Sequence, residues 1–455
     1  MDRFDVVVVG GGGTGSEIAF QIARRSGLRV AIAERDKLGG ECNHYGCVPT
    51  KVMLRSAKIA SLAQDAERYG VRIPEVEVDF AAVRRRVRDV IEGQSGGGAQ
   101  PFEQIGIAVF LQEARLVGEH RLELEDGTKI EGKHIVLATG SEATLPPVPG
   151  LADGPYWTNR EAIWSPDAVP RSLGVIGTGA IGIEFSQIYA RFGSRVTAIE
   201  ALPRILPAED DEAAAELVPA LEEEGIRLLS GAELRLAEHA RGGWRLEIAG
   251  EPPIEVDELI VATGRRPVFD VHDLGAAGVD LDEDGRPILS DTLRTTAPNV
   301  WAAGDATGDL LFTHVGSYEA ELVVDDILGN PRPRDYRVVP RVTFCDPEIA
   351  SVGLTERESR EAGMDVRTAV VHLDDNERSQ IDGRTHGLVK LVADARTSTL
   401  VGGHIVGEEA GAMIHEVVAA MAGRIPFADV GDAIHAYPTL SESVKAAFER
   451  LSDRD

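Results

Sequence analysis

The chain has few cysteines, few basic residues relative to acidic ones, and no long apolar run. Three cysteines in 455 residues are too few for a disulfide-stapled fold. No apolar stretch reaches the roughly 18 residues that indicate a transmembrane helix. Lys and Arg number 47 against 75 Asp and Glu, and the resulting net charge of −28 disfavours nucleic acid and anionic membranes as partners.

The N-terminal sequence also lacks targeting features. MDRFDVVVVG leads straight into a strand pattern, without the basic stretch, apolar segment and cleavage site of a secretory signal. We therefore expect a cytoplasmic protein. In that reducing compartment, two cysteines at close spacing indicate redox or metal chemistry.

Apolar β-branched runs alternate with helical patterns along the first part of the chain. A strand pattern at Asp5–Val9 is followed by a helical pattern at Ser16–Arg25 and a second strand pattern at Arg29–Ala33. This order predicts a parallel sheet with crossover helices. The same design starts again at Ser172, so the sequence predicts an α/β fold with two nucleotide-binding units.

Two proline-rich segments predict the domain boundaries. The first, Ser141–Gly150, places a boundary near Gly150. The second, Gly329–Pro340, precedes a strand-rich region that ends in a helical pattern at Ser441–Leu451. We expect a separate C-terminal domain after it.

The first nucleotide-binding unit carries a glycine fingerprint. Gly10, Gly12 and Gly15 form G-x-G-x-x-G between a strand and a helix, where glycine allows the backbone to approach a pyrophosphate at the helix N-terminus. Glu34 ends the next strand, where a carboxylate accepts hydrogen bonds from a ribose. Together these features predict a dinucleotide site.

The second unit repeats this fingerprint with Gly177, Gly179 and Gly182, and Glu200 ends its following strand. A carboxylate at that position repels a 2′-phosphate, so we expect NAD to be preferred over NADP, although Arg204 moderates this preference. Two dinucleotides in one chain indicate electron transfer between them, as from a nicotinamide to a flavin.

Cys42 and Cys47 stand at the start of a segment that is predicted to be helical to about Ala63. The positive end of a helix and the nearby Lys51 stabilise a thiolate, which favours a reactive cysteine pair. The alternatives are two buried core cysteines or half of a metal site. Cys345, the only other cysteine, is isolated in RVTFCDPEIA, so we assign it no role and predict no metal site.

At this point the chain resembles the pyridine-nucleotide-dependent flavoprotein disulfide reductases, the group that contains dihydrolipoamide dehydrogenase, glutathione reductase and mercuric reductase. The resemblance covers essentially the full length. It rests on both fingerprints, the C-x4-C segment that continues to VPTK, TAPNVWAAGDAT, FCDPEIASVGLTE and the terminal HAYPTLSES.

The resemblance implies two Rossmann-like domains, for FAD and NAD, and a C-terminal α+β dimerisation domain. We expect an FAD-binding domain with the redox disulfide at 1–150, an NAD(P)-binding domain at 151–270, a central segment that completes the FAD site at 271–336, and an interface domain at 337–455. A homodimer with an active site shared between subunits follows.

The resemblance also implies roles for individual residues. Asp305 holds the FAD ribityl chain, and Lys51 pairs with Glu184 near the reactive nitrogen of the flavin. Cys47 lies beside the flavin as the charge-transfer thiolate, while Cys42 is the interchange thiol that meets the substrate. Further positions are expected to line the cofactors: Gly40, Thr139, Gly140, Gly264 and Gly304.

The C-terminal motif departs from most of the family. Tyr437 occupies the position of the His general acid/base, while its partner Glu is retained as Glu442. With a pKa of about 10, a phenol is a poor base at neutral pH, although it can donate a hydrogen bond or ligate a soft metal ion. His435 aligns with a non-catalytic position. His44, between the cysteines, is a candidate for tuning the thiolate or carrying a proton.

The sequence therefore predicts an enzyme that passes electrons from NADH through FAD to the Cys42–Cys47 disulfide. The acceptor is expected to be a small-molecule or protein disulfide, a metal ion or a quinone. Dihydrolipoamide dehydrogenase and a non-catalytic FAD-binding protein are the alternatives. Ala180, where some relatives carry a tyrosine that covers the flavin, predicts an open nicotinamide pocket.

Overall fold

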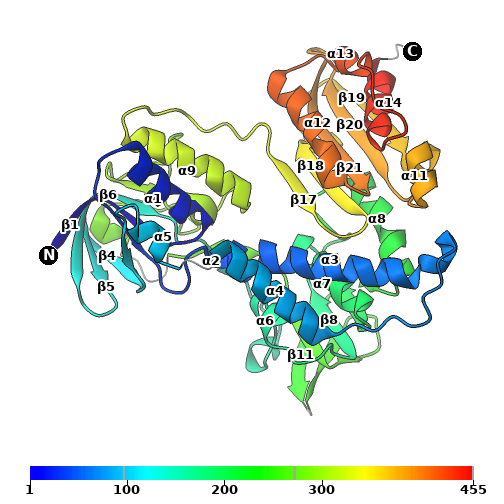
Figure 1. The fold of residues 1–455 in the computed structure, drawn as a ribbon, viewed down its shortest axis with the longest axis horizontal. Helices are drawn as coiled ribbons and strands as arrows, with labels where there is room; N and C mark the ends of the chain where they lie inside the picture. Colours follow the sequence, from blue (N-terminus) through cyan, green and yellow to red (C-terminus); the bar gives the residue numbers. More distant parts are fainter. Residues whose placement is uncertain (96–97, 241, 270–272, 453–455) are drawn as a thin grey trace. The chain divides into compact units, whose positions relative to one another are not determined.

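The computed structural model describes residues 1–95, 98–240, 242–269 and 273–452 (Figure 1). The predicted boundary between residues 270 and 271 lies outside this set. Each of the two compact units consists of three chain segments. Unit 1 contains Met1–Val52, Arg84–Thr144 and Arg265–Asp335, and unit 2 contains Met53–Val83, Leu145–Gly264 and Tyr336–Asp455.

Unit 1 is built on a seven-stranded sheet whose core strands are parallel. Strand β1 (Asp2–Val9) pairs with β2 (Val30–Ala33) and β6 (Lys129–Leu137), and β3 (Ala108–Phe110) and β16 (Val300–Ala302) extend the parallel part. Strands β4 (Ala114–Gly118) and β5 (Arg121–Leu124) add an antiparallel edge.

Alternate residues of β1 enter two different cores. Val6 and Val8 pack with residues of helices α1 (Gly13–Arg25) and α9 (Thr313–Ile327), whereas Val7 and Val9 belong to the core of the opposite face. A strand that is covered on both faces needs apolar residues at consecutive positions. This explains the uninterrupted run VVVV.

Unit 2 contains the second parallel sheet, in the order β10-β9-β8-β14. Its strands are β8 (Ser172–Ile176), β9 (Arg195–Ile199), β10 (Arg227–Leu229) and β14 (Glu258–Val261). Helix α7 (Ala180–Arg191) follows β8, and α8 (Asp211–Glu223) lies between β9 and β10 in the chain. An antiparallel sheet of β11 (Leu234–Ala240), β12 (Gly243–Ile248) and β13 (Ile254–Val256) is inserted before β14.

The C-terminal part of unit 2 is an antiparallel sheet of five strands. The strands are β17 (Pro340–Thr343), β18 (Glu348–Gly353), β19 (Val366–His372), β20 (Leu388–Asp394) and β21 (Thr399–Gly407). Helices α12 (Ala410–Gly423) and α14 (Ser441–Ser452) share its apolar core. The predicted fold class, two Rossmann-like parts and a C-terminal α+β part, is confirmed.

A buried cation of the C-terminal sheet pairs with carboxylates at the starts of two helices of unit 2. Lys390 of β20 has a side chain that is only 3% exposed, and its Nζ lies 3.0 Å from Asp210, 2.6 Å from Glu212 and 2.9 Å from Glu356. Burial alone would lower the pKa of Lys390, but these carboxylates raise it above its ordinary value. The ammonium group therefore stays charged and holds α8 and α10 (Glu356–Glu361) against the C-terminal sheet.

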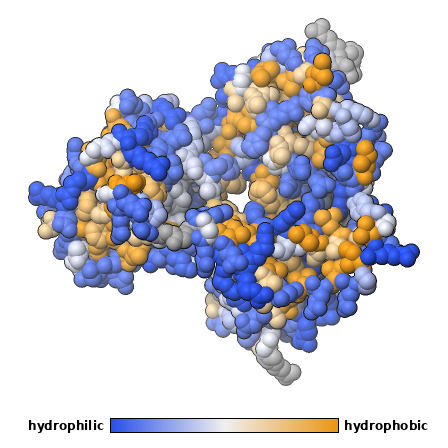
Figure 2. Space-filling view, viewed as in Figure 1, coloured by the Kyte–Doolittle hydropathy of each residue, from blue (hydrophilic) through white to orange (hydrophobic). Residues whose placement is uncertain are grey.

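The surface reflects the acidic composition. Hydrophilic side chains cover much of the visible face of each unit, with hydrophobic residues scattered among them (Figure 2). Among the described helices, none combines the length and the apolar character that crossing a bilayer requires.

Candidate active site

The first glycine fingerprint forms the tight turn between β1 and α1. Gly10 has φ +102°, and a Cβ atom there would lie 2.1 Å from the carbonyl oxygen of Ala138. A Cβ at Gly15 would lie 1.9 Å from the oxygen of Gly10, whereas nothing lies within 4 Å of that position at Gly12. Packing thus requires glycine at two positions, and the third leaves open space beside the helix N-terminus, as a bound pyrophosphate needs.

Glu34 braces this turn from the end of β2. One carboxylate oxygen accepts a hydrogen bond from Gly11 N at 2.6 Å, and the other accepts one from Asp36 N at 2.7 Å. Gly40 packs against the same turn, because a Cβ there would lie 2.6 Å from the Cα of Gly12. The predicted ribose acceptor therefore also fixes the loop that would carry the pyrophosphate.

Two further predicted positions fit a bound flavin nucleotide. The Thr139 Oγ1 atom is buried and has no hydrogen-bond partner among the described residues, so a ligand is a suitable partner for it. Gly140 follows with φ +73°, in open space. Gly304 has φ +70° and packs on Thr14, which places Asp305 at the start of a short 3-10 helix. The donors and glycines of unit 1 therefore fit FAD.

The structure divides the predicted cysteine helix in two. Cys42 lies in α2 (Gly40–His44), and Cys47 is the first residue of α3 (Cys47–Gln64). Tyr45 and Gly46 interrupt the helix, because the N–H of Tyr45 closes α2 on Glu41 and the carbonyl of Gly46 already accepts from the first turn of α3. Cys47 consequently sits at a helix N-terminus, which favours its thiolate.

Cys42 and Cys47 are not joined by a disulfide, and their sulfur atoms interact with each other. The hydrogen bond to Cys47, burial and the nearby Cys47 charge raise the pKa of Cys42, while Thr313 and Lys51 act in the opposite direction. Of the two sulfurs, Cys42 is therefore the one on which these contacts favour a proton. The Thr313 Oγ1 atom lies 3.5 Å from the Cys47 Sγ atom.

Thr313, the first residue of α9, was not predicted from the sequence. It is 266 residues from Cys47, and no recognisable motif marks it.

His44 has a local role: its Nε2 lies 2.9 Å from the carbonyl oxygen of Leu38 and carries the hydrogen, since a carbonyl only accepts. Burial raises the pKa of Cys345, whose Sγ donates to the Pro347 carbonyl. An unreactive third cysteine is consistent with these contacts.

The second fingerprint has the same construction in unit 2. A Cβ at Gly177 would lie 2.4 Å from the oxygen of Ala262, one at Gly182 would lie 2.0 Å from the oxygen of Gly177, and Gly179 faces open space. Gly264, with φ +120°, ends the strand turn that follows β14. This geometry leaves room for a second pyrophosphate beside α7.

The carboxylate of Glu200 is buried behind this turn. It accepts from the N–H and the hydroxyl of Thr178, both at 2.9 Å, and from Leu202 N at 2.9 Å. Arg204 donates to the carbonyl oxygens of Leu206 at 2.8 Å, Pro207 at 3.0 Å and Glu209 at 2.8 Å, and pairs with Asp211. The guanidinium is thus committed to this loop.

The predicted pair of Lys51 and Glu184 spans the two units and stays a prediction. Lys51 belongs to unit 1, and Glu184 lies in α7 of unit 2, where it is buried. One of its carboxylate oxygens accepts a hydrogen bond from Phe344 N at 2.9 Å. This contact positions the carboxylate within its own unit.

The C-terminal motif presents a tyrosine to the surface. Tyr437 is 70% exposed, and the neighbouring carboxylate of Glu377 raises its phenol pKa above the ordinary value. Glu442 accepts a hydrogen bond from Thr439 N at 3.0 Å. The nearby His435 is held by Glu416, with 2.7 Å between its Nε2 and a carboxylate oxygen. The phenol of Tyr437 is therefore even less ionised at neutral pH than a free phenol, and His435 is paired with Glu416.

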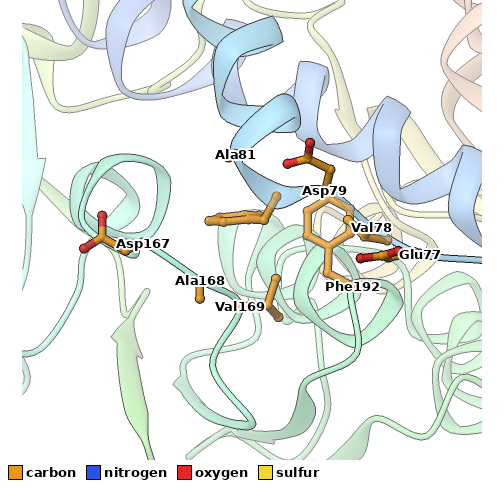
Figure 3. Close-up of a pocket in the computed structure, with 9 residues that line it drawn as sticks. Glu77, Val78, Asp79, Ala81, Asp167, Ala168, Val169 and Phe192 are labelled. Atoms are coloured by element: carbon orange, nitrogen blue, oxygen red, sulfur yellow. The ribbon is translucent and has the colours of Figure 1, made fainter.

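A surface pocket of ≈ 620 Å³ lies in unit 2 at the start of helix α4 (Phe80–Ser95) (Figure 3). Phe80 and Phe192 contribute apolar rings to its wall, 6.0 Å apart between centroids. The carboxylates of Asp79 and Asp167 lie at opposite sides (Figure 3). No predicted site residue lines the pocket, so we assign it no part in the chemistry.

Comparisons with known proteins agree with this geometry. The sequence profile of the family described as "Pyridine nucleotide-disulphide oxidoreductase" matches residues 4–320, and the profile of its dimerisation domain matches residues 339–448. The chain is 37% identical over 461 residues to a dihydrolipoyl dehydrogenase from Chlorobaculum tepidum, a match that covers 99% of this chain and 97% of the relative.

A mercuric reductase from Bacillus cereus is 34% identical over 449 residues, covering 98% of this chain and 71% of that protein. Among solved structures, the Cu(II) complex of the HOCl-induced flavoprotein disulfide reductase RclA from Escherichia coli is similar with a TM-score of 0.88. Its sequence is 28% identical, and the match covers 98% of this chain and 99% of that one.

Proposed function

The chain belongs to the pyridine nucleotide-disulphide oxidoreductases and is an NAD(P)H-dependent flavoprotein enzyme, and we propose that it delivers electrons from NADH through Cys42 and Cys47 to a soft metal ion or an activated disulfide. The observation that carries this choice of acceptor is the exposed Tyr437, whose pKa lies above that of an ordinary phenol. Such a residue gives an acceptor little help from a general base.

In this proposal the first fingerprint, Glu34, Thr139 and Asp305 hold FAD. The glycines leave room for its pyrophosphate, the carboxylates accept from its hydroxyls, and Thr139 gains the partner it lacks among the described residues. When bound, FAD would supply the two-electron chemistry that links a nicotinamide to sulfur.

The cysteines complete the transfer. Two electrons and one proton convert the Cys42–Cys47 disulfide into one thiol and one thiolate. The proton stays on Cys42, whose pKa is raised, and the negative charge stays on Cys47 at the N-terminus of α3. Cys42 is then the sulfur that meets the acceptor, and reoxidation of the pair returns the disulfide.

The acceptor follows from what each substrate needs. Dihydrolipoamide chemistry requires a base that takes a proton from a thiol, and a phenol whose pKa lies above about 10 is nearly all protonated at pH 7. A metal ion with high affinity for thiolate sulfur requires no such base. Relatives that are mercuric reductases and the neighbour described as a Cu(II) complex support this class of acceptor.

We propose NADH as the physiological donor. The Glu200 carboxylate lies where it would accept hydrogen bonds from an adenosine ribose and repel a 2′-phosphate. Arg204, the nearby cation, is held by four backbone carbonyls and by Asp211. Binding a phosphate through Arg204 would first break these contacts, so it offers NADPH little compensation.

We also propose a homodimer in which residues of the C-terminal motif enter the active site of the second copy. The family's dimerisation domain supports the dimer. Ile434 is 99% exposed and stands three residues before the exposed Tyr437, as expected of a segment that a second copy covers.

An NADH-coupled screen tests the proposed acceptor. Lipoamide, glutathione disulfide, Hg²⁺, Cu²⁺, a quinone and oxygen are compared in the wild type and Cys42→Ser. We expect metal-ion reduction that Cys42→Ser abolishes, with two Cu²⁺ ions reduced for each NADH because copper accepts one electron. Metal reduction that survives this substitution would place the exit of electrons at the flavin and contradict the proposal.

Dihydrolipoyl dehydrogenase activity is the second candidate, because a relative of that name is 37% identical over nearly the whole chain. Vigorous wild-type turnover of dihydrolipoamide with NAD would favour it. A third candidate, FAD binding without catalysis, would require that NADH fails to bleach the bound flavin.

A further inference from the structure

Three segments of unit 1 that are distant in sequence converge on one guanidinium group. Arg265 begins β15 (Arg265–Pro267), which pairs antiparallel with β7 (Ser141–Ala143). Its Nε atom donates to the Ser141 Oγ atom at 2.8 Å, and its terminal nitrogen donates to the Ser141 carbonyl oxygen at 2.7 Å. The Arg265 side chain is 14% exposed.

The Ser141 hydroxyl links Arg265 to Asp305 through two hydrogen bonds. Its Oγ atom donates to Asp305 Oδ2 at 2.5 Å. A hydroxyl has one hydrogen, so the same oxygen must accept from Arg265, and the direction of the chain is fixed. Among the described residues, no hydrogen bond to Asp305 Oδ1 is present. The direction of Oδ1 is therefore set by the hydrogen bond from Ser141 to Oδ2 of the same carboxylate.

The same guanidinium reaches the redox helix. A terminal nitrogen of Arg265 lies 3.6 Å from Glu41 Oε1, and Glu41 directly precedes Cys42 in α2. Helix α2 has only five residues, so a side-chain contact contributes to holding it in place. Arg265 thus links the carboxylate of Asp305 to the segment that carries the interchange thiol.

We propose that Arg265 is a positioning residue that acts through Ser141 to aim Asp305 at a flavin hydroxyl and through Glu41 to hold the Cys42 helix. This inference rests on the proposed binding of FAD by Asp305. The proposal gives Arg265 and Ser141 a role in FAD binding. It also places the charge of Arg265, through Glu41, near the reactive sulfur of Cys42.

The test measures FAD affinity rather than turnover. Apoprotein is titrated with FAD, and flavin fluorescence gives the dissociation constant. We expect Arg265→Gln to raise this constant about tenfold, as loss of a charge-assisted hydrogen bond would, and Ser141→Ala to have a similar effect. The neighbouring Arg266→Gln is the matched control, since Arg266 pairs with Glu142 at the surface and should leave affinity within about twofold.

A double variant shows whether Arg265 and Ser141 affect FAD binding through the same chain of contacts or independently of each other. If Arg265 acts through Ser141, Arg265→Gln combined with Ser141→Ala weakens FAD binding no more than the larger single effect. Multiplied effects would overturn the proposal. Wild-type affinity in Arg265→Gln would overturn it too, whereas failure of the wild type itself to bind FAD would refute the proposed function instead.

The proposed effect of Arg265 on the Cys42 helix is tested separately, by the alkylation rate of Cys42 in the reduced holoenzyme. Removing Arg265 leaves the Glu41 charge uncompensated beside Cys42, so Arg265→Gln should slow alkylation several-fold at neutral pH, and adding Glu41→Gln should restore it. An alkylation rate that Arg265→Gln leaves unchanged, or that Glu41→Gln fails to restore, would exclude the link to the redox helix.

Discussion

Replacing Thr313 by Val should raise the pKa of the Cys47 thiol. The Thr313 hydroxyl lies 3.5 Å from the Cys47 Sγ atom and donates to it when the sulfur is charged. Hydrogen bonds to charged groups contribute about 1.5–3 kcal/mol, and the length of this one favours the lower end. At about 1.36 kcal/mol for each pKa unit, Thr313→Val should raise the Cys47 pKa by about one unit.

The assay is the long-wavelength absorbance that a thiolate gives beside an oxidised flavin, followed against pH in enzyme reduced by one equivalent of NADH. Thr313→Ser keeps the hydroxyl and should titrate like the wild type. The position of α9 is common to both variants, so its dipole does not distinguish them. A midpoint in Thr313→Val equal to that of the wild type would refute the reasoning.

The remaining predictions concern unit 2. Lys390→Met should lower the free energy of unfolding by about 3–5 kcal/mol in chemical denaturation, because it leaves the buried carboxylate of Asp210 without its cation. Burial opposes the charge of Asp210, but His404 and Lys390 lower the pKa of this carboxyl group. The stabilisation of the folded state by the Asp210 carboxylate is therefore complete above about pH 4 and is lost as the pH falls through the lowered pKa. Chemical denaturation at pH 5 and pH 3 measures this loss. Tyr437→His should increase lipoamide turnover at least tenfold while leaving metal-ion reduction within about twofold; equal lipoamide rates would argue against the proposed acceptor. Glu200→Ala should lower the NADH-to-NADPH ratio of kcat/KM about tenfold, measured by steady-state kinetics.

Much of the fold was predictable because its signals are local. The strand, glycine turn and helix around Gly10 and around Gly177 follow from the backbone conformations that only glycine adopts easily and from consecutive apolar residues in strands covered on both faces. The cysteine pair was predictable for the same reason, since one short segment of sequence contains it.

The contacts that tune the site were not predictable. Thr313 meets Cys47 across 266 residues, and Arg265 meets Ser141 across 124, so only the folded backbone brings them together. The division of the cysteine helix at Gly46 was also missed, because the helical pattern continues on both sides of it. Neither the long-range contacts nor the break in the helix produces a periodic pattern or a motif in a single sequence.

The buried Lys390 has a consequence for how unit 2 can be dissected. Its three carboxylate partners come from the start of α8, beside the second nucleotide-binding sheet, and from α10 in the C-terminal part. A recombinant fragment that ended before residue 336 would keep Asp210 and Glu212 and lose the cation that neutralises them. The two modules visible in the sequence are therefore one cooperative piece, and cutting the gene between them should yield an unstable product.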